Sequence, residues 1–458
     1  MPTLTFHGGV DEIGGNKILL ETKKSRVWLD FGTSFSKMNM FYAEFIRPRT
    51  INGIGDFIEM GLTPWLKGLY RNDYVKQAGL EESKPMFDGV FITHPHADHF
   101  GDINLLHKNI PVFMGECTKT FIESYETTGM GKDYINVREA FTGLHHSKNP
   151  KVKRNIKTFR TGDKINVNDI SVQPVHVDHS IPGSYGFIVE CSNKNIVYTG
   201  DIRLHGPKGA MTREFVEKAK GLDPDVLIIE GTRITEEKTM TEEQVLAKIK
   251  KIMADTKGLV IGNFPARDID RFMTFYTAAK ETGRTLLVDL KQAYLIKQLE
   301  SDPSLSMPRL DDRHLFVYYR KKLSYSRWEK ELIESCRNLV EAKDIAQKES
   351  VLYCNSFSMG ELIDVRPVKN SSYIYSLCAP FNEEMQLDYK RLMNWVNHFN
   401  LDYYEAHASG HASPEELAWV IEEINAKKLI PVHTEDSRGF KKFTKKITPA
   451  APGEKINV

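Results

Sequence analysis

The chain has 458 residues, and its 62 Lys and Arg residues nearly balance its 61 Asp and Glu residues, so the formal net charge is +1. A chain of this length predicts about two to four domain-sized units. A nearly neutral chain attracts neither nucleic acid nor an anionic membrane as a whole, so any such partner must meet a local charged face. No apolar run reaches the roughly 18 residues that a membrane-spanning helix needs.

Cysteine usage indicates the compartment. The five cysteines are scattered and form no CxxC pair. This pattern excludes a disulfide framework and a cysteine metal site, and it favours a reducing environment. The N-terminus also lacks the basic and apolar regions of a signal peptide. We therefore expect a cytoplasmic protein with no membrane association.

The first 90 residues predict strands, glycine turns and a long irregular segment. Strands are expected at 3–7, 17–21 and 26–30, and the glycines between the first two fit a hairpin turn, because no GxGxxG opens a helix there. Asp30 ends the third strand, where it either forms a turn or orients a metal-binding histidine from behind. Residues 33–87 are rich in aromatic and basic residues, and either form a substrate lid or pack onto the body.

The most informative stretch follows a predicted strand at 88–93. His94, His96, Asp98 and His99 fall within six residues, where Asp98 is expected to cap a helix that runs to about His107. Neutral imidazoles and a carboxylate on one turn are ligands for a divalent cation. Burying so many polar groups without a cation would be costly, so this turn predicts a metal site.

Further candidate ligands follow at the ends of predicted strands. His176 and His179 cannot share a face of a strand, so we expect His179, beside a Pro-Gly turn, to be the ligand and His176 to pack. Asp201 and Glu230 each end an apolar strand, where a carboxylate such as Asp201 can bridge two cations. With Asp30 they predict a shared acidic rim.

From Thr241 onward the pattern changes to alternating helices and strands, which predicts an inserted parallel α/β unit at about 235–400. Its expected helices include 291–300 and 325–341. The loop 262–267, which ends in Arg267, either binds a ligand at the carboxyl end of a strand or is structural. Basic and aromatic residues at 318–328 either follow a phosphate backbone or form a solvated face.

Histidines return at the end of the chain, where His407, His411 and His433 all follow predicted strands. With these residues in view, the sequence resembles the RNase J family of β-CASP ribonucleases, which have the metallo-β-lactamase fold. The resemblance is carried by the opening Gly8-Gly9 to Asn16, the HxHxDH turn, His179-Ser180-Ile181-Pro182, Gly200-Asp201, Ser409-Gly410-His411-Ala412 and Pro431-Val432-His433. The HxHxDH turn alone indicates only the wider fold, whereas the late motifs behind an inserted α/β unit indicate cleavage of nucleic-acid phosphodiesters.

The resemblance implies an αββα sandwich with an inserted parallel β-CASP domain, divided as 1–234, 235–400 and 401–458. It implies two cations, zinc or manganese. His94, His96 and His179 would hold one, Asp98, His99 and His433 the other, and Asp201 would bridge them with Asp30 behind. His411, with Glu230 beside it, would donate a proton to the leaving oxygen. Ser409, His411 and Arg267 would bind a 5′-phosphate.

The activity so implied is 5′-to-3′ exonucleolytic cleavage of single-stranded RNA from 5′-monophosphate ends, with some endonuclease activity. A β-CASP DNA nuclease or another two-metal hydrolase is the alternative, and a scaffold without activity is less compatible with a complete ligand set. The chain is similar to the short archaeal members, and a homodimer is possible. Thr434 stands where the family has a glycine after the last histidine.

Overall fold

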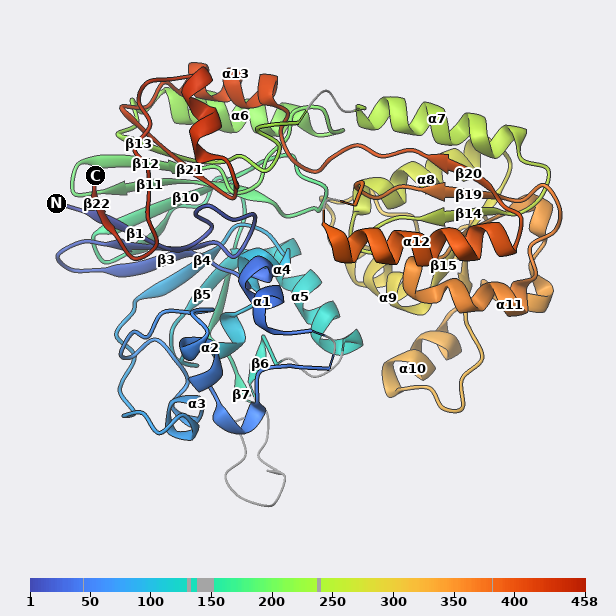
Figure 1. Ribbon diagram of the computed structural model, residues 1–458, viewed down its shortest axis with the longest axis horizontal. Coiled ribbons are helices and arrows are strands. Elements are labelled where there is room, and N and C mark those ends of the chain that lie inside the picture. The colour runs from blue at the N-terminus through green and yellow to red at the C-terminus, as the bar shows by residue number, and fades with distance from the viewer. Residues whose placement is uncertain (44, 130–132, 138–151, 237–239, 381) are drawn as a thin grey trace. The chain divides into compact units, whose positions relative to one another are not determined.

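The computed structural model describes residues 1–43, 45–129, 133–137, 152–236, 240–380 and 382–458. The chain forms two compact units (Figure 1). The first contains Met1–Leu204, Lys208–Lys238 and Gly410–Val458, and the second contains His205–Pro207 and Thr239–Ser409. The limits 1–234, 235–400 and 401–458 stay a prediction. Among the described residues, no helix has both the length and the apolar character needed to cross a membrane.

The first unit is built on two large sheets. One has the strand order β22-β1-β2-β3-β4-β5-β8 and the other β21-β13-β12-β11-β10-β9. The strands of the first sheet are β22 (Lys455–Asn457), β1 (Thr3–Gly8), β2 (Lys17–Glu21), β3 (Arg26–Phe31), β4 (Gly89–Ile92), β5 (Val112–Gly115) and β8 (Ile156–Phe159). Those of the second are β21 (Lys428–Val432), β13 (Val226–Glu230), β12 (Lys194–Tyr198), β11 (Tyr185–Cys191), β10 (Ile170–His176) and β9 (Ile165–Val167). A short ribbon pairs β6 (Asn136–Val137) with β7 (Val152–Lys153).

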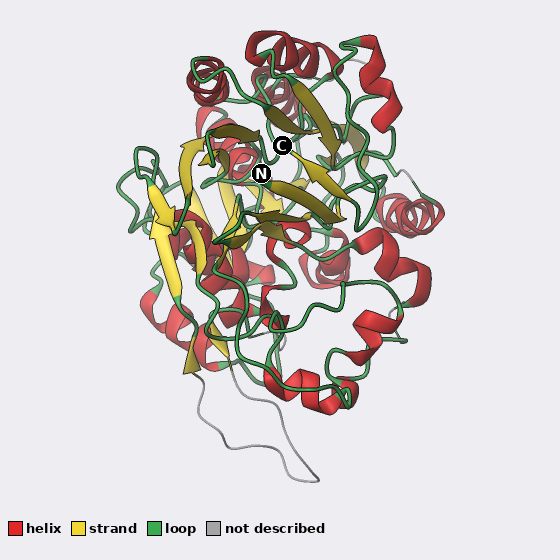
Figure 2. Cartoon of the chain, turned by 90° about the vertical axis from the view of Figure 1, so that its left-hand side faces the viewer, coloured by secondary structure: helices red, strands yellow, loops and turns green. Residues whose placement is uncertain are grey.

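Both faces of these sheets are covered. In β3, Val27 and Leu29 point into the core between the sheets, whereas Trp28 points to the outer face, as the alternation of a strand requires. The outer face of the second sheet packs against α6 (Gly209–Lys220) and α13 (Pro414–Ile424). Figure 2 shows helices outside the strands of this unit. The first unit is therefore the expected αββα sandwich.

The segment 33–87 covers the outer face of the first sheet. It contains α1 (Phe35–Phe41), α2 (Gly55–Glu59) and α3 (Asn72–Gln77). Ile54, Leu69, Tyr70 and Val75 are buried in the same core as Trp28. These residues of the segment pack onto the first sheet, as one of the two interpretations of the sequence predicts.

The second unit contains a parallel sheet of order β17-β16-β15-β18-β14-β19-β20. Its strands are β14 (Val260–Asn263), β15 (Thr285–Asp289), β16 (Leu315–Tyr318), β17 (Leu339–Val340), β18 (Ser350–Tyr353), β19 (Ser372–Tyr375) and β20 (Asp402–Glu405). Its helices are α7 (Glu242–Asp255), α8 (Ile269–Glu281), α9 (Leu290–Leu299), α10 (Arg327–Ser335), α11 (Leu362–Val365) and α12 (Glu383–His398). Separate hydrophobic cores lie on the two faces of the sheet, which confirms the inserted α/β fold.

Two expected helices are wrong in length. The helix expected at 98–107 is only α4 (Ala97–Phe100), with His96 rather than Asp98 at its N-cap. It ends because the N–H of Asp102 bonds to Phe31 O at 3.1 Å, which ties the chain back to β3. The helix expected at 325–341 ends at Ser335, because the next residues form β17 and pair with β16.

Candidate metal centre

The HxHxDH turn lies between the carboxyl end of β4 and α4, against a closely packed backbone. A Cβ atom on Gly14 would lie 2.6 Å from Asp98 Oδ2, and one on Gly32 would lie 1.6 Å from the Asp98 carbonyl oxygen. The backbone N–H of Asn16 donates to the same carbonyl at 3.1 Å. Gly14, in the predicted hairpin turn, and Gly32, after β3, therefore make room for a candidate ligand.

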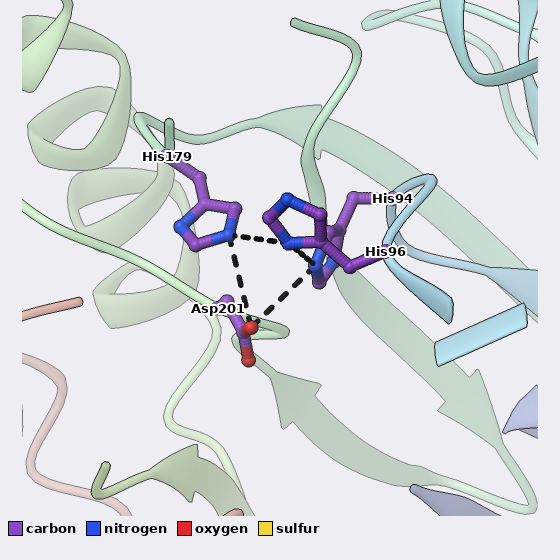
Figure 3. Close-up of side chains that lie close together, drawn as sticks. All are labelled: His94, His96, His179 and Asp201. Carbon is purple, nitrogen blue, oxygen red and sulfur yellow. Dashed lines mark hydrogen bonds and ion pairs between the residues drawn. The ribbon is translucent and has the colours of Figure 1, made fainter. Parts of the chain in front are cut away.

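His94, His96 and His179 converge on Asp201 (Figure 3). Their ligand atoms and an Asp201 oxygen all lie within 4.8 Å of one another. His96 Nδ1 lies 3.0 Å from both His94 Nε2 and His179 Nε2. We refer to these three histidines as the His94 group.

The hydrogen-bond partners of the His94 group determine which ring nitrogens carry lone pairs. Thr93 Oγ1 donates to Asp30, so it accepts from His94 Nδ1 at 3.0 Å. His179 Nδ1 donates to the carbonyl of Gly410. In the neutral rings, His94 Nε2 and His179 Nε2 therefore carry lone pairs, and both face His96 Nδ1, which has at most one proton to donate.

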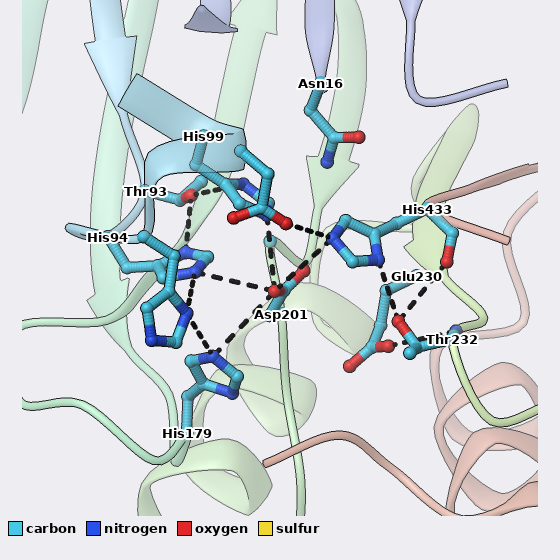
Figure 4. A network of polar contacts seen from close by, with 12 residues as sticks. Asn16, Thr93, His94, His99, His179, Asp201, Glu230, Thr232 and His433 are labelled. Atoms are coloured by element: carbon cyan, nitrogen blue, oxygen red, sulfur yellow. Dashed lines mark hydrogen bonds and ion pairs between the residues drawn. The ribbon is translucent and has the colours of Figure 1, made fainter. Parts of the chain in front are cut away.

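Asp98, His99 and His433 form a second cluster, which we call the His99 group. His433 Nε2 lies 3.1 Å from Asp98 Oδ2, and His99 Nε2 lies 3.2 Å from Asp201 Oδ2. Thr232 Oγ1 holds His433 Nδ1 at 2.7 Å. Figure 4 shows members of both groups around Asp201, namely His94, His179, His99 and His433.

Asp201 Oδ2 is the common point of the centre. It lies 3.5 Å from His94, 3.8 Å from His179, 3.2 Å from His99, 3.7 Å from His433 and 3.8 Å from His411, in each case to a ring nitrogen. The strand register explains the convergence. The neighbouring strands β12, β13 and β21 are parallel, so Asp201, Glu230 and His433 leave the same edge of the sheet.

Behind His99 lies a chain of buried hydrogen bonds. Asp30 Oδ2 accepts from His99 Nδ1 at 2.7 Å and from the Tyr198 hydroxyl at 2.7 Å. Asn16 Nδ2 donates to that hydroxyl at 2.9 Å. Asp30 thus contacts a candidate ligand, His99, from behind, as one of the two interpretations of the sequence predicts. Nothing in the sequence shows that Tyr198 and Asn16 meet behind Asp30, because the contact joins residues far apart in the chain.

His411 and Glu230 lie beside the two groups. His411 Nδ1 donates to Glu230 Oε2 at 3.0 Å, and Glu230 Oε1 accepts from the N–H of Ile202 at 2.9 Å. Burial disfavours a charge on His411, but the carboxylates of Glu230 and Asp201 outweigh it and raise the pKa of His411 to about 9. Its ring is partly exposed, whereas Glu230 is buried. This pair can hold and deliver a proton.

The protonation of the other ligands, apart from His99, suits a cation. Burial disfavours a charge on His99, but Asp201 and Asp30 outweigh it and raise the pKa of His99 well above its usual value. Burial lowers the pKa of His94 and His179 well below the usual value and that of His96 to about 4, so these rings are neutral near pH 7. Burial opposes charge on Asp98 and Asp201, yet the surrounding histidines outweigh it and lower the pKa of both carboxyls. Neutral imidazole and ionised carboxylate are the forms that bind metal.

Unpartnered atoms test whether the residues fit a divalent cation. Among the described side chains, His99 Nε2 and both carboxylate oxygens of Asp201 are buried without a hydrogen-bond partner. Unsatisfied buried groups cost about 1–3 kcal/mol each, more when charged. A cation would coordinate all three atoms, so the donor set fits a metal.

The remaining expected residues lie elsewhere. His176 stacks on Tyr185 at 4.1 Å and contacts Thr161, and it is not among the clustered ligands. Ser409 and Arg267 belong to the second unit, whereas His411 belongs to the first. The phosphate pocket that these three residues would form therefore stays a prediction.

The sandwich and its His/Asp cluster define the metallo-β-lactamase superfamily. Residues 66–260 match a beta-lactamase superfamily domain, and residues 398–448 match a Zn-dependent metallo-hydrolase RNA specificity domain. A protein of unknown function from Enterococcus faecalis V583 has the same fold, with a TM-score of 0.76, 24% identity and 99% of each chain covered.

Proteins called Ribonuclease J are similar over most of the chain. The one from Mycoplasma genitalium is 22% identical over 93% of this chain and 67% of its own length, and the one from Pyrococcus abyssi is 22% identical over 93% and 88%. The one from Sinorhizobium meliloti is 28% identical over 46% of this chain. The chain is therefore similar to ribonuclease J proteins over most of its length. It spans 35%, 67% and 56% of the first three curated relatives it matches.

Proposed function

We propose that the protein is a metal-dependent ribonuclease that hydrolyses RNA phosphodiesters. Its main mode would be 5′-to-3′ exonucleolytic cleavage from 5′-monophosphate ends, with some endonuclease activity. The observation that carries the proposal is the convergence of five histidine rings on Asp201 Oδ2, with the Glu230-bonded His411 among them. The names of the relatives and the RNA specificity domain support RNA as the substrate.

The centre would hold two divalent cations, zinc or manganese. The His94 group would hold one and the His99 group the other, with Asp201 shared between them. When bound, the cations would neutralise the anionic phosphodiester and supply a nucleophile from water at neutral pH. Thr93, Gly410 and Thr232 would keep the imidazoles in the tautomers that present lone pairs.

His411 would act as the general acid. Because its Nδ1–H is engaged by Glu230, its Nε2–H is the proton available to the leaving 3′ oxygen. Glu230 is itself held by the N–H groups of Ile202 and Thr232, which fixes the direction of the imidazole. His411 is thus a proton donor that Glu230 orients and keeps charged.

Substrate binding and cellular context extend the proposal. Ser409, His411 and Arg267 would bind the 5′-phosphate of a single-stranded RNA, which would account for a preference for monophosphate ends. The cytoplasmic location and the homodimer stay predictions from the sequence.

The test is a time course on RNA labelled at its 3′ end, with 5′-monophosphate or 5′-triphosphate termini, with manganese or with chelator. We expect stepwise shortening of the monophosphate RNA that chelator abolishes. Internal cuts that ignore the 5′ group would make the protein an endonuclease. No cleavage of RNA, with cleavage of single-stranded DNA, would establish the DNA nuclease instead.

A matched pair of variants connects activity to the centre. His179→Ala should abolish cleavage, whereas His176→Ala, three residues away and outside the cluster, should cleave within about threefold of the wild-type rate. Equal losses in both variants would show that the segment matters only for folding.

A further inference from the structure

A buried ion pair joins the two segments that carry His179 and Asp201. Asp178 directly precedes His179, and Arg203 follows Asp201 by two residues. Both side chains are 0% exposed, and Arg203 Nε donates to Asp178 Oδ1 at 3.3 Å. The backbone N–H of Arg203 also donates to the carbonyl oxygen of Asp178 at 2.9 Å. The two segments are therefore joined through both side chain and backbone.

The start of α6 reinforces the same junction. Thr212 Oγ1 accepts from the N–H of Asp178 at 2.8 Å and donates to the carbonyl oxygen of Arg203 at 2.9 Å. The N–H of Lys208 donates to Asp178 Oδ2 at 3.2 Å. One hydroxyl thus touches both segments, and the carboxylate is held from two directions.

Stability alone is a poor reason for such a pair, because well-packed apolar residues often replace a buried ion pair without loss. What apolar residues cannot supply is a contact of fixed direction between two loops. The atoms that depend on it are His179 Nε2 and Asp201 Oδ2, which lie 3.8 Å apart. Ligands must be held within about 0.5 Å of a productive geometry, so this junction has a direct consequence for the centre.

We propose that Asp178 and Arg203, joined by Thr212, are positioning residues that set the distance between His179 and Asp201 and so the cation affinity of the His94 group. The inference rests on the proposed metal centre. It concerns cation affinity rather than cleavage, so the two fail separately: a wild-type protein that binds zinc but cleaves no RNA contradicts the proposed function and leaves this inference standing.

The chain offers a control for a merely structural role. Arg154 is a second buried arginine of the same unit, and its guanidinium donates to the carbonyl oxygens of Tyr134, Leu106 and His107. None of these acceptors is a candidate ligand. Arg154→Lys should therefore reduce stability through the same loss of geometry without changing the centre.

The experiment compares Arg203→Lys, Asp178→Asn and Arg154→Lys in the full chain. Zinc affinity is measured by calorimetric titration of chelator-treated protein, and thermal unfolding is measured in chelator. We expect all three to unfold at lower temperature, with zinc binding at the His94 group weakened at least tenfold in the first two and within twofold of wild type in Arg154→Lys.

Thr212→Val keeps the inference testable if the charged variants do not fold. It removes only the hydroxyl that touches both segments and should weaken zinc binding severalfold, whereas Thr212→Ser should restore it. Unchanged zinc affinity in a folded Arg203→Lys or Thr212→Val protein would overturn the proposal. Equal weakening in Arg154→Lys would also overturn it, as would a wild-type protein that binds neither zinc nor manganese.

Discussion

The His94 group and the His99 group share Asp201 but are supported by different chemistry. In the His94 group, the outer nitrogens of His94 and His179 contact an uncharged hydroxyl and an uncharged carbonyl. In the His99 group, the outer nitrogen of His99 contacts the carboxylate of Asp30 at 2.7 Å. The His99 group also contains a carboxylate of its own, Asp98.

This difference bears on cation affinity. A carboxylate behind an imidazole fixes its tautomer and makes it a more basic ligand, and each added negative charge strengthens attraction for a cation. The His99 group has both effects, whereas the His94 group has only the shared Asp201 and an indirect link from His94 through the Thr93 hydroxyl to Asp30. We therefore expect two unequal sites, of which the His99 group is the tighter.

The largest effect is expected where the two groups meet. Asp201→Asn removes one negative charge from the shared carboxylate and should lower cation affinity in both groups. Cleavage should fall by more than about a hundredfold, the upper range for losing only a supporting residue. Elemental analysis after dialysis and cleavage rates check this. Loss of a single ion would show that Asp201 belongs to one group only.

A variant of His411 tests whether this residue is a metal ligand or a general acid. The question arises because a further set of residues lies close enough together to hold an ion: Asp201, Glu230, His411 and His433. If His411 is the general acid, His411→Gln should lower kcat by about a hundredfold to ten-thousandfold. Its ion content should match that of wild type. Loss of an ion from this variant would make His411 a ligand and would redraw the His99 group.

Asp30→Asn should weaken the His99 group by about tenfold to a hundredfold and the His94 group less, because Asp30 contacts His99 Nδ1 directly but reaches His94 only through the Thr93 hydroxyl. Asp102→Asn is the control, since Asp102 is a buried aspartate that pairs with Lys17. It should lower stability without changing ion affinity. Competition with a zinc-sensitive dye measures both variants.

The smallest effect is expected at Tyr198, which contacts Asp30 and not a candidate ligand. Tyr198→Phe removes the hydroxyl that donates to Asp30 at 2.7 Å, which leaves the carboxylate oriented by Thr93 and His99. We expect a severalfold loss of affinity, confined to the His99 group. A loss as large as that of Asp30→Asn would mean that Tyr198, not the carboxylate charge, determines the difference between the groups.

The sequence predicts best what is local or repeated. The HxHxDH turn brings four candidate ligands together because they are adjacent, and the strand ends at Asp201, Glu230 and His433 meet because parallel strands end at one edge. The inserted α/β unit follows from the alternation of strands and helices, whereas the αββα sandwich is implied by the resemblance to the RNase J family. The structure confirms both.

The contacts that could not be predicted join residues that are far apart in the sequence. Asn16 and Tyr198 are 182 residues apart in the chain, and no local pattern shows that they meet behind Asp30. Asp178 and Arg203 meet only because β10 and β12, which lie on either side of β11, end at the same edge of the sheet. The short α4 has the same cause, since a bond from Asp102 to β3 ends the helix that the local sequence favours.

The measurement that tests two unequal sites most directly is a calorimetric zinc titration of chelator-treated wild type and Asp30→Asn. We expect two ions per chain, bound in two separate steps, and in Asp30→Asn a larger shift of the tighter step than of the weaker one. A single ion per chain, or an equal shift of both steps, would contradict two groups of unequal affinity around Asp201.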